Sequence, residues 1–500
     1  MAEIDSELDG LPSVQISHVV DINPGVDKSL LSDDDRLPFI AMPAVEARTG
    51  KIDTRETRRY QDVKTGFTSF QSGDVLFAKI TPCMENGKMA IFPHTVPGVG
   101  FGSTEFHVLR PTAFIDNRYL YYFVSSSAFR HEAQHNMSGA VGQKRVPKDF
   151  IAGHEIPITS INEQRRVVEK IEVLFSQLDK GEEAIRAVQA LLKRYRQSVL
   201  KAAVTGELTA GWRAENSGKL EHGRDLLARI LKSRRDTWSG RGQYKEPVAP
   251  DTSDLPELPD GWAWATLGQL ISLIEAGKNV RCIERAPKDQ ETGIVKISAV
   301  TWDQFDEWES KTIQDEDHLN ENALIQHGDL LISRANTLEL VGASVVVEKI
   351  EKRLQLSDKV LRLKPVIPIE RWINYVLKSR LGRHQIESRA TGAQMSMRNI
   401  SQRNLETIAV PIPSLEEMTV IVDSIKIAQS REMATTDQLE LELARSSSLR
   451  QSILKDAFTG RLVEQDPTDE PATDLLARIK AARADTPKKS RGRPSRQAMA

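Results

Sequence analysis

Basic and amide side chains follow strand-like segments of this sequence at places suited to contacts with nucleic acid. They form two sets, one within residues 79–145 and one within residues 334–398. Arginine, lysine and glutamine on loops at strand ends can bind phosphates and hydrogen-bond base edges in the major groove. The alternative is that they are ordinary solvated side chains. The two sets are Lys79, Gln143, Lys144 and Arg145, and Arg334, Arg389, Gln394 and Arg398.

Catalytic motifs are not evident. The sequence has no GxxxxGK[ST] phosphate loop. The stretch GVGFGS at residues 98–103 resembles the glycine turn of a methyl-donor site, but a strand-like segment follows it rather than a helix. The stretch DINPGV at residues 21–26 lacks the second proline and the aromatic residue of an Asn-Pro-Pro-aromatic motif. We interpret both stretches as turns and expect no catalytic residue.

Metal and membrane sites are not expected either. His131 and His135 stand four residues apart without an evident third ligand, so we expect a solvated helix face. Cys83 and Cys282 lie far apart, which is typical of a reducing compartment. No run of about eighteen apolar residues occurs, and the acidic start at residues 1–12 does not look like a signal peptide. We therefore expect a cytoplasmic protein without a membrane contact.

The two basic sets lie at matching places of an internal repeat. The phrase RQSVLKAAVTGEL begins at Arg196 and RQSILKDAFTGRL begins at Arg450, which is 254 residues later. Upstream, QSGDVLFAK at residues 71–79 matches QHGDLLISR at residues 326–334, and DLLARI occurs both at Asp225 and at Asp474. The chain is therefore a tandem duplication of about 250 residues, with room for two to four domains.

Each copy changes from β-rich segments to one long helix. Short strand-like runs separated by turn residues fill residues 12–155 and 258–411, which predicts two mixed α+β domains. Apolar residues then recur every three or four positions from Val167 to Ala202, and a weaker seam continues to Ile453 in the second copy. A helix of this length spans about 60 Å. Two such helices pair most simply as an antiparallel coiled coil; the alternative is that each packs on its own domain.

The linker and the C-terminal segment carry local charge. Net charge is −2, so attraction to a polyanion must come from local patches. Residues 478–496 hold eight Lys and Arg against one acid, Asp485. Within them, RGRP resembles an AT-hook, in which Arg491 and Arg493 would enter a narrow A·T minor groove. The alternative is a disordered basic tail that has affinity for phosphates alone.

Together these features resemble the specificity subunits of type I restriction–modification systems. The resemblance covers nearly the whole chain. It rests on the two-fold repeat, on GD[VL]L before Lys79 or Arg334, on SGA…QKR and TGAQMSMR, and on long helices that end in RQS[VI]LK…TG.L. It implies an α+β fold in which two mixed α/β target-recognition domains are separated by two long helices, forming an antiparallel coiled coil within a pseudo-two-fold tandem repeat.

The expected division of the chain follows from the repeat. It comprises a first target-recognition domain (1–158), a first spacer helix (159–209), a linker with a short amphipathic helix (210–257), a second target-recognition domain (258–412), a second spacer helix (413–464), and a short helix with a disordered basic tail (465–500).

The resemblance further implies a non-catalytic DNA-recognition subunit. Each target-recognition domain would read one half of an asymmetric bipartite site in double-stranded DNA. The helices would set the spacer length and dock two methyltransferase subunits, which restriction and motor subunits then join. S-adenosylmethionine, ATP and Mg²⁺ would be used through those other subunits, and this chain alone would bind DNA weakly. The alternatives are a coiled-coil scaffold with protein-binding heads and a stand-alone DNA methyltransferase.

Overall fold

The computed structural model describes residues 11–140, 142–239, 242–300, 304–314, 317, 319–394 and 397–484. The chain divides into two compact units. Unit 1 contains residues 1–185 and 440–500, and unit 2 contains residues 186–439. Each unit holds one sheet-rich domain and a part of each long helix.

Unit 1 is built on two four-stranded sheets. The first is antiparallel and consists of β2 (Val20–Ile22), β9 (Phe106–Pro111), β6 (Val75–Ala78) and β7 (Met89–Ile91), in that order. The second consists of β4 (Thr57–Arg59), β3 (Arg36–Ile40), β8 (Val99–Gly102) and β5 (Thr68–Gln71), and its β3–β8 pair is parallel. β1 (Ser13–Gln15) pairs with β10 (Glu155–Pro157). The short helices are α1 (Ile16–Val19), α2 (Tyr60–Val63), α3 (Asn117–Ser125), α4 (Ser127–His135) and α5 (Lys148–Gly153).

Unit 2 repeats the first of these sheets and varies the second. Its antiparallel sheet consists of β12 (Ile271–Ala276), β20 (Val360–Pro365), β16 (Leu330–Ser333) and β18 (Ser344–Val346). A second sheet consists of β13 (Cys282–Ile283), β15 (Ser310–Ile313), β14 (Gly293–Val295) and β19 (Leu354–Gln355). β11 (Ala263–Thr266) pairs with β23 (Ala409–Ile412), and β17 (Ala335–Asn336), β22 (Met397–Asn399) and β21 (Thr391–Gln394) form a small third sheet. The short helices are α7 (Ala210–Glu215), α8 (Gly223–Asp236), α9 (Leu267–Leu270), α10 (Glu370–Lys378), α11 (Arg380–Arg389) and α12 (Gln402–Glu406).

The central strands are buried on both faces. In β6, Val75 and Phe77 enter the core against the helices of unit 1, whereas Leu76 enters a second core between the sheets. In β16, Leu330 and Leu331 divide in the same way between two cores. This alternation follows from the two-residue period of a strand. The antiparallel sheet has the same strand order in both units, which shows the tandem repeat that the sequence predicted, whereas the second sheet differs in its outer strand.

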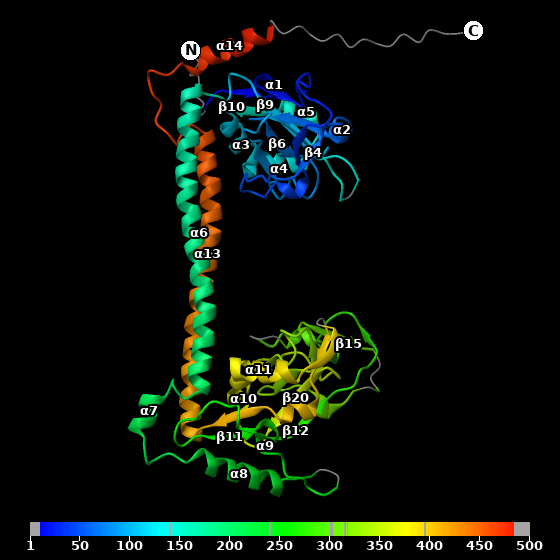
Figure 1. Ribbon diagram of the computed structural model, residues 1–500, viewed down its shortest axis with the longest axis vertical. Coiled ribbons are helices and arrows are strands. Elements are labelled where there is room, and N and C mark those ends of the chain that lie inside the picture. Colours follow the sequence, from blue (N-terminus) through cyan, green and yellow to red (C-terminus); the bar gives the residue numbers. More distant parts are fainter. Residues whose placement is uncertain are drawn as a thin grey trace, which may run out of the picture. The chain divides into compact units, whose positions relative to one another are not determined.

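The long helices α6 (Ile161–Val204) and α13 (Leu415–Phe458) contain 44 residues each and pack side by side (Figure 1). In unit 1, Arg450 lies 2.6 Å from Asp179 of α6, and Ser446 donates to Glu182 at 2.7 Å. In unit 2, Val199 lies beside Ile425. Within each unit the numbering rises along one helix as it falls along the other, which confirms the predicted antiparallel pair. Among the described residues, no helix combines the length and the apolar character needed to cross a membrane.

The repeated phrase RQS[VI]LK places each helix end in a hydrophobic core. Leu200 of α6 is buried in the core of unit 2 with Trp372, and Leu454 of α13 is buried in the core of unit 1 with Tyr119. Gly206 and Gly460, just beyond the helices, have φ of 73° and 75°, which suits a glycine that ends a helix. Each long helix therefore begins at the domain of its own copy and ends in the core of the other copy's domain.

We expect Leu200→Ala to destabilise unit 2, although Leu200 follows the first domain in sequence. Truncation of a buried leucine leaves a cavity and should lower the free energy of unfolding by about 2–5 kcal/mol. Hydrogen exchange followed by mass spectrometry should show lost protection in residues 263–412 and unchanged protection in residues 13–157. Lys201→Ala, which alters the exposed neighbouring residue, is the control. Equal losses of protection in both domains would contradict this packing.

Candidate nucleic-acid interface

The GD[VL]L motif forms the turn before each central strand. The Asp74 carboxylate accepts the Gln71 amide at 2.8 Å, and the Asp329 carboxylate accepts the Gln326 amide at 2.9 Å. Asp74 is also paired with Arg110 through two hydrogen bonds of 2.8 Å, and its side chain is 1% exposed. The motif is therefore structural: it fixes the start of the strand whose other end carries a predicted DNA-binding residue.

Lys79 and Arg334, which directly follow the two central strands, are held by matching main-chain bonds. The Lys79 amide donates to the Glu105 carbonyl at 2.9 Å, and the Lys79 carbonyl accepts the Val146 amide at 2.9 Å. The Arg334 amide donates to the Lys359 carbonyl at 2.8 Å, and the Arg334 carbonyl accepts the Ile400 amide at 3.0 Å. The Lys79 side chain is half-buried, whereas Arg334 is exposed.

In unit 1 the predicted residues after the glycine loop lie beside Lys79. Arg145 exchanges main-chain bonds of 2.8 and 3.0 Å with Ser138, and it also forms a bridge with Ile80. Its guanidinium binds the Glu105 carboxylate at 2.8 and 2.9 Å. This hydrogen bonding lowers the pKa of Glu105 and raises that of Arg145. Arg145 thus has a carboxylate partner.

The other two members of this set point to solvent. Gln143 and Lys144 are both exposed. The Lys144 amide donates to the Thr81 hydroxyl at 3.1 Å, so the loop that carries these side chains is fixed to the segment after β6. The structure therefore brings Lys79, Gln143, Lys144 and Arg145 together at one edge of the domain.

In unit 2 the equivalent hairpin is β21–β22, which extends onto β17. Arg398 pairs with Asn336 in the β17–β22 ladder and donates to the Gly392 carbonyl at 2.7 Å. Gln394 pairs with Met397 and is exposed. Arg398 lies near Arg334, because Ile400, just beyond β22, binds the Arg334 carbonyl, whereas Gln394 lies on β21, one strand farther from β17.

The main-chain pairing aligns the two hairpins with a shift of one residue relative to the alignment of their sequences. Arg145 pairs with Ile80, and Asn399 pairs with Ala335, which follows Arg334 as Ile80 follows Lys79. Arg145 therefore corresponds to Asn399, and Lys144 corresponds to Arg398. The glycines of SGA and TGA match: Gly139 and Gly392 have φ of 128° and 143°, and a Cβ on either would meet the opposite strand's carbonyl at 2.9 or 2.5 Å.

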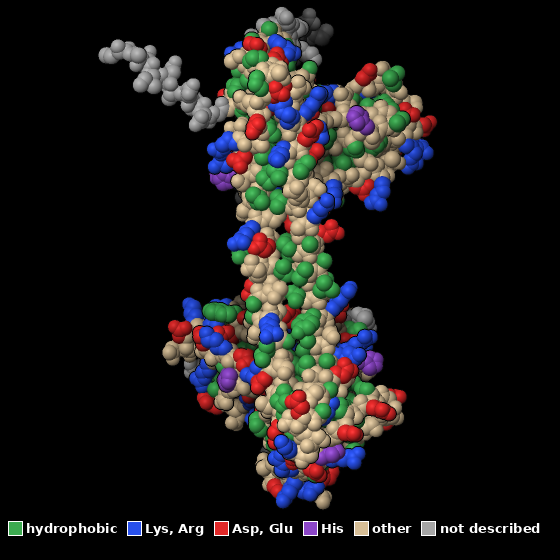
Figure 2. Space-filling view, turned by 90° about the vertical axis from the view of Figure 1, so that its left-hand side faces the viewer, with side chains coloured by type: hydrophobic (Ala, Val, Ile, Leu, Met, Phe, Trp, Pro, Cys, Tyr) green, Lys and Arg blue, Asp and Glu red, His purple; other side chains and the backbone are tan. Residues whose placement is uncertain are grey.

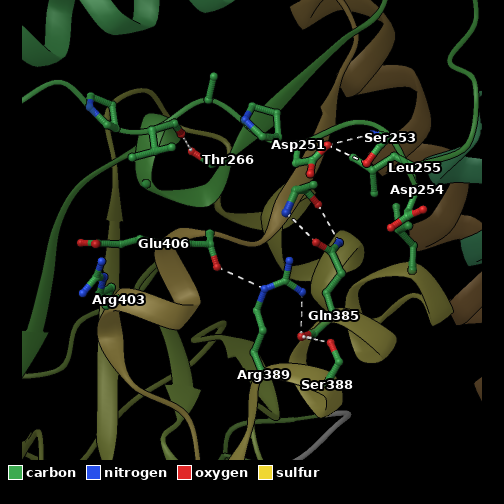
Figure 3. A pocket seen from close by; sticks show the side chains of 18 of the residues that line it. Asp251, Ser253, Asp254, Leu255, Thr266, Gln385, Ser388, Arg389, Arg403 and Glu406 are labelled. Atoms are coloured by element: carbon green, nitrogen blue, oxygen red, sulfur yellow. Dashed lines mark hydrogen bonds between the residues drawn. The ribbon is translucent and has the colours of Figure 1, made fainter.

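Arg389 lies apart from this group, at the end of α11. Its guanidinium donates to the Thr407 hydroxyl at 3.1 Å and to the Gln385 carbonyl at 3.0 Å, and partial burial lowers its pKa. It lines a cavity of about 1290 Å³ within unit 2, between α11 and α12 on one side and residues 243–256 on the other. Figure 3 shows Arg389 facing this cavity from below, with Asp251 and Ser253 above.

Sequence reasoning missed three groups that hold or flank these side chains. Glu105 binds Arg145, Thr81 anchors Lys144, and Asn336 lies next to Arg398 in the small sheet. Asparagine is a suitable reader of adenine, so Asn336 joins the candidate residues. The position of Asn336, two residues beyond GDLLISR, is the sequence feature that could have identified it as a candidate. Arg491 and Arg493 lie outside the described residues, so their role stays a prediction.

The histidine pair His131 and His135 lies on α4 and is exposed. Residues 131–135 read His-Glu-Ala-Gln-His, which has the HExxH spelling of a zinc site. The two imidazoles meet edge to face with ring centroids 4.3 Å apart, and His135 Nδ1 is hydrogen-bonded to the His131 carbonyl at 2.8 Å. Within the described part of the chain, no three His, Cys, Asp or Glu side chains are grouped so as to hold a metal ion.

Comparisons with known proteins point in one direction. Residues 13–187 match the model of the type I restriction modification DNA specificity domain. The specificity subunit of the type I restriction enzyme EcoEI from Escherichia coli is 27% identical over 503 residues, covering 90% of this chain and 82% of that subunit. The EcoKI specificity subunit of E. coli strain K12 is 27% identical over 395 residues, covering 75% of this chain and 74% of that subunit.

A solved structure shares the fold. One chain of a structure that concerns complex assembly and conformational transition of the type I restriction–modification system superimposes with a TM-score of 0.65 at 19% identity. The match covers 90% of this chain and 98% of that chain.

Removal of the aspartate charge should destabilise the GD turn of unit 1 more than that of unit 2. Asp74→Asn leaves Arg110 without a carboxylate and should cost about 3–5 kcal/mol in the free energy of unfolding. Asp329→Asn should cost less, because Arg362 keeps Glu275 at 2.5 Å. Urea unfolding of the two variants, with local hydrogen exchange at β6 and β16, tests the comparison. An equal or larger loss in Asp329→Asn would show that the second carboxylate does not compensate.

Proposed function

The chain belongs to the family of type I restriction–modification DNA specificity subunits, and we propose that its two domains each read one half of an asymmetric, bipartite site in double-stranded DNA. The proposal rests on one observation: the same main-chain hydrogen bonds occur in both units, but they hold different side chains. Lys79 corresponds to Arg334, Lys144 to Arg398, and Arg145 to Asn399. Equal frames would present both hairpins to DNA alike, while the different side chains would select different bases.

The chemistry of these side chains supports two kinds of contact. Lysine at positions 79 and 144 provides a compact charge suited to phosphate. Gln143 and Gln394 are exposed and can pair with adenine edges, and Arg398, fixed by the Gly392 carbonyl, can pair with guanine. Arg389, which lies at the cavity, would serve as a phosphate contact. The proposed set is Lys79, Gln143, Lys144, Arg145, Arg334, Arg389, Gln394 and Arg398.

We further propose that the long helices dock two modification subunits and fix the spacer between the half-sites. Large apolar side chains are exposed on both helices; they are Val173, Val188, Leu191 and Tyr195 on α6, and Ile427, Met433, Leu441 and Leu449 on α13. Figure 2 shows hydrophobic side chains gathered along the helix pair. Exposed apolar patches of this kind mark protein interfaces. Because the phrase RQS[VI]LK recurs, each helix end would offer a similar surface to a copy of one partner.

Membership of the family also suggests where the cofactors act. We propose that S-adenosylmethionine, ATP and Mg²⁺ serve the complex through its modification and restriction subunits. This chain then supplies recognition and assembly.

Replacing Gln143 and Lys144 with alanine should relax recognition of one half-site and leave the other intact. Loss of a base contact costs about 5- to 150-fold in discrimination. Single-molecule sequencing of methylated adenines in cells that express the whole complex measures this. Arg398→Ala with Gln394→Ala should relax the other half-site instead.

Lys180→Ala, an exposed change on α6, is the matched control and should leave both half-sites unchanged. A wild-type pattern that is a continuous palindrome would refute two-domain reading. A complex that methylates no bipartite site at all would favour a scaffold role.

Charge placed on the helix face should release the modification subunit. Leu191 and Met433 are 58% and 55% exposed, so Leu191→Glu with Met433→Glu should leave the fold intact. Burial of these charges in an interface should lower retention of the modification subunit on the tagged chain by at least about tenfold. Lys193→Glu, an exposed charge change on the same helix, is the control. Unchanged retention would exclude this face as the docking surface.

A further inference from the structure

The repeated sequence DLLARI forms a helix that docks on each domain. In α8, Leu226 and Ile230 are buried in the core of unit 2, and the helix packs on α9. In α14 (Ala472–Ala484), Leu475 and Ile479 are buried in the core of unit 1, and the helix packs on α1. Since α9 and α1 follow β11 and β1 respectively, the two helices occupy equivalent places in their units.

An arginine near the end of each helix binds a main-chain carbonyl of the same unit. Arg234, nine residues after Asp225, donates to the Ile271 carbonyl at 2.9 Å. Arg483, nine residues after Asp474, donates to the Ser17 carbonyl. Each arginine thus binds a main-chain carbonyl at the short helix on which its own helix packs, within α1 in unit 1 and directly after α9 in unit 2.

In unit 2, the chain beyond α8 crosses one face of the domain as a strap, defined as residues 243–256. Arg234 donates to the Tyr244 hydroxyl at 2.9 Å at the start of the strap. Farther along, the Val248 carbonyl accepts the Thr266 hydroxyl at 2.8 Å. The strap then forms one wall of the cavity whose floor is α11 and α12 (Figure 3).

The strap and its floor carry opposite charges. The strap holds three carboxylates and one lysine: Glu246, Asp251, Asp254 and Lys245. Glu246 is bound by Arg235 of α8, so Asp251 and Asp254 are the strap carboxylates left to complement the floor. The floor holds three arginines and one carboxylate: Arg380, Arg389, Arg403 and Glu406. Lys201 of α6 adds a further positive charge to the lining. The negative charge of the strap therefore complements the positive charge of the floor beneath it.

The equivalent floor in unit 1 has the reverse sign. α4 and α5 correspond to α11 and α12, and their N-cap residues, together with the β10 and β23 pairing, align the positions. Glu132, Asp149 and Glu155 stand where unit 2 has Gln385, Arg403 and Ala409, and all three are exposed. The Glu132 carboxylate lies 3.6 Å from His154 Nδ1, and Glu155 accepts the Ser13 hydroxyl at 2.8 Å. The neighbouring cationic or titratable groups are Lys148, Lys455, His18, His131 and His135.

We propose that residues 485–500 are the counterpart of the strap and dock on this acidic face of unit 1, made by α4, α5 and β10. They carry five Lys and Arg and one acid, so their charge complements the face as the acidic strap complements its basic floor. The length suffices: Val248 lies 14 residues beyond Arg234, and 17 residues follow Arg483. The ligand of the basic segment is then this chain's own domain.

Photocrosslinking in the full-length chain tests the docking. With p-benzoylphenylalanine in place of Gly492, we expect crosslinks within residues 127–155, mapped by mass spectrometry, in protein free of DNA. The triple variant Glu132→Lys, Asp149→Lys and Glu155→Lys should lower the yield by about fivefold or more. Charge reversal of Lys488, Arg491 and Arg493 to glutamate in that variant should restore it.

Two controls make the result decisive. Arg380→Glu with Arg403→Glu alters the corresponding floor of unit 2 and should leave the tail crosslink unchanged. The neutral variant Glu132→Gln, Asp149→Asn and Glu155→Gln should give an intermediate yield at an unchanged melting temperature, which separates charge from unfolding. Crosslinks that fall elsewhere, that ignore the charge reversals, or that form with added DNA alone would overturn the proposal; the last result would assign the tail to DNA.

Discussion

Burial of each long helix's end in the core of the other copy's domain is the constraint on which the rest of the structure depends. The middle of the helix pair contains exposed apolar side chains such as Val188 and Met433, so the pair itself buries limited apolar area there. Leu200 and Leu454, by contrast, are almost fully buried. Because hydrophobic burial is proportional to the area removed from water, the helix ends stabilise the chain more than its middle does. The repeated sequence RQS[VI]LK therefore buries an equivalent helix end in the core of each domain.

That constraint separates stability from recognition. Asp74 and Asp329 fix the turns, and the glycines of SGA and TGA allow the hairpin strands to approach closely. None of these groups needs to touch a ligand. The side chains that the frame carries, such as Lys144 and Arg398, can then differ between copies without a change in the main-chain bonds. In the proposed function, this separation would allow one repeated scaffold to carry the side chains for two unlike half-sites.

The sequence predicted the helices and the repeat better than it predicted the contacts of individual side chains. Heptad spacing and identical phrases are local signals, so the two helices and the duplication were predictable. The partner of Arg145 was not, because Glu105 lies 40 residues earlier and meets it through strand packing. The one-residue shift in strand pairing between the two hairpins likewise could not be predicted from the sequence. Arg389 was grouped with the hairpin by sequence proximity, whereas the direction of its helix turns it toward the cavity.

The repeat creates a pairing problem that charge can solve. α8 and α14 bury the same residue types, Leu226 and Ile230 or Leu475 and Ile479, so apolar packing alone does not tell either helix which domain to choose. The segments that follow carry opposite net charge, and so do the floors at the two domains. In the proposed arrangement, a wrong pairing would set like charges against each other. Opposite polarity would thus give each segment one correct domain, in a molecule whose hydrophobic contacts are nearly symmetric.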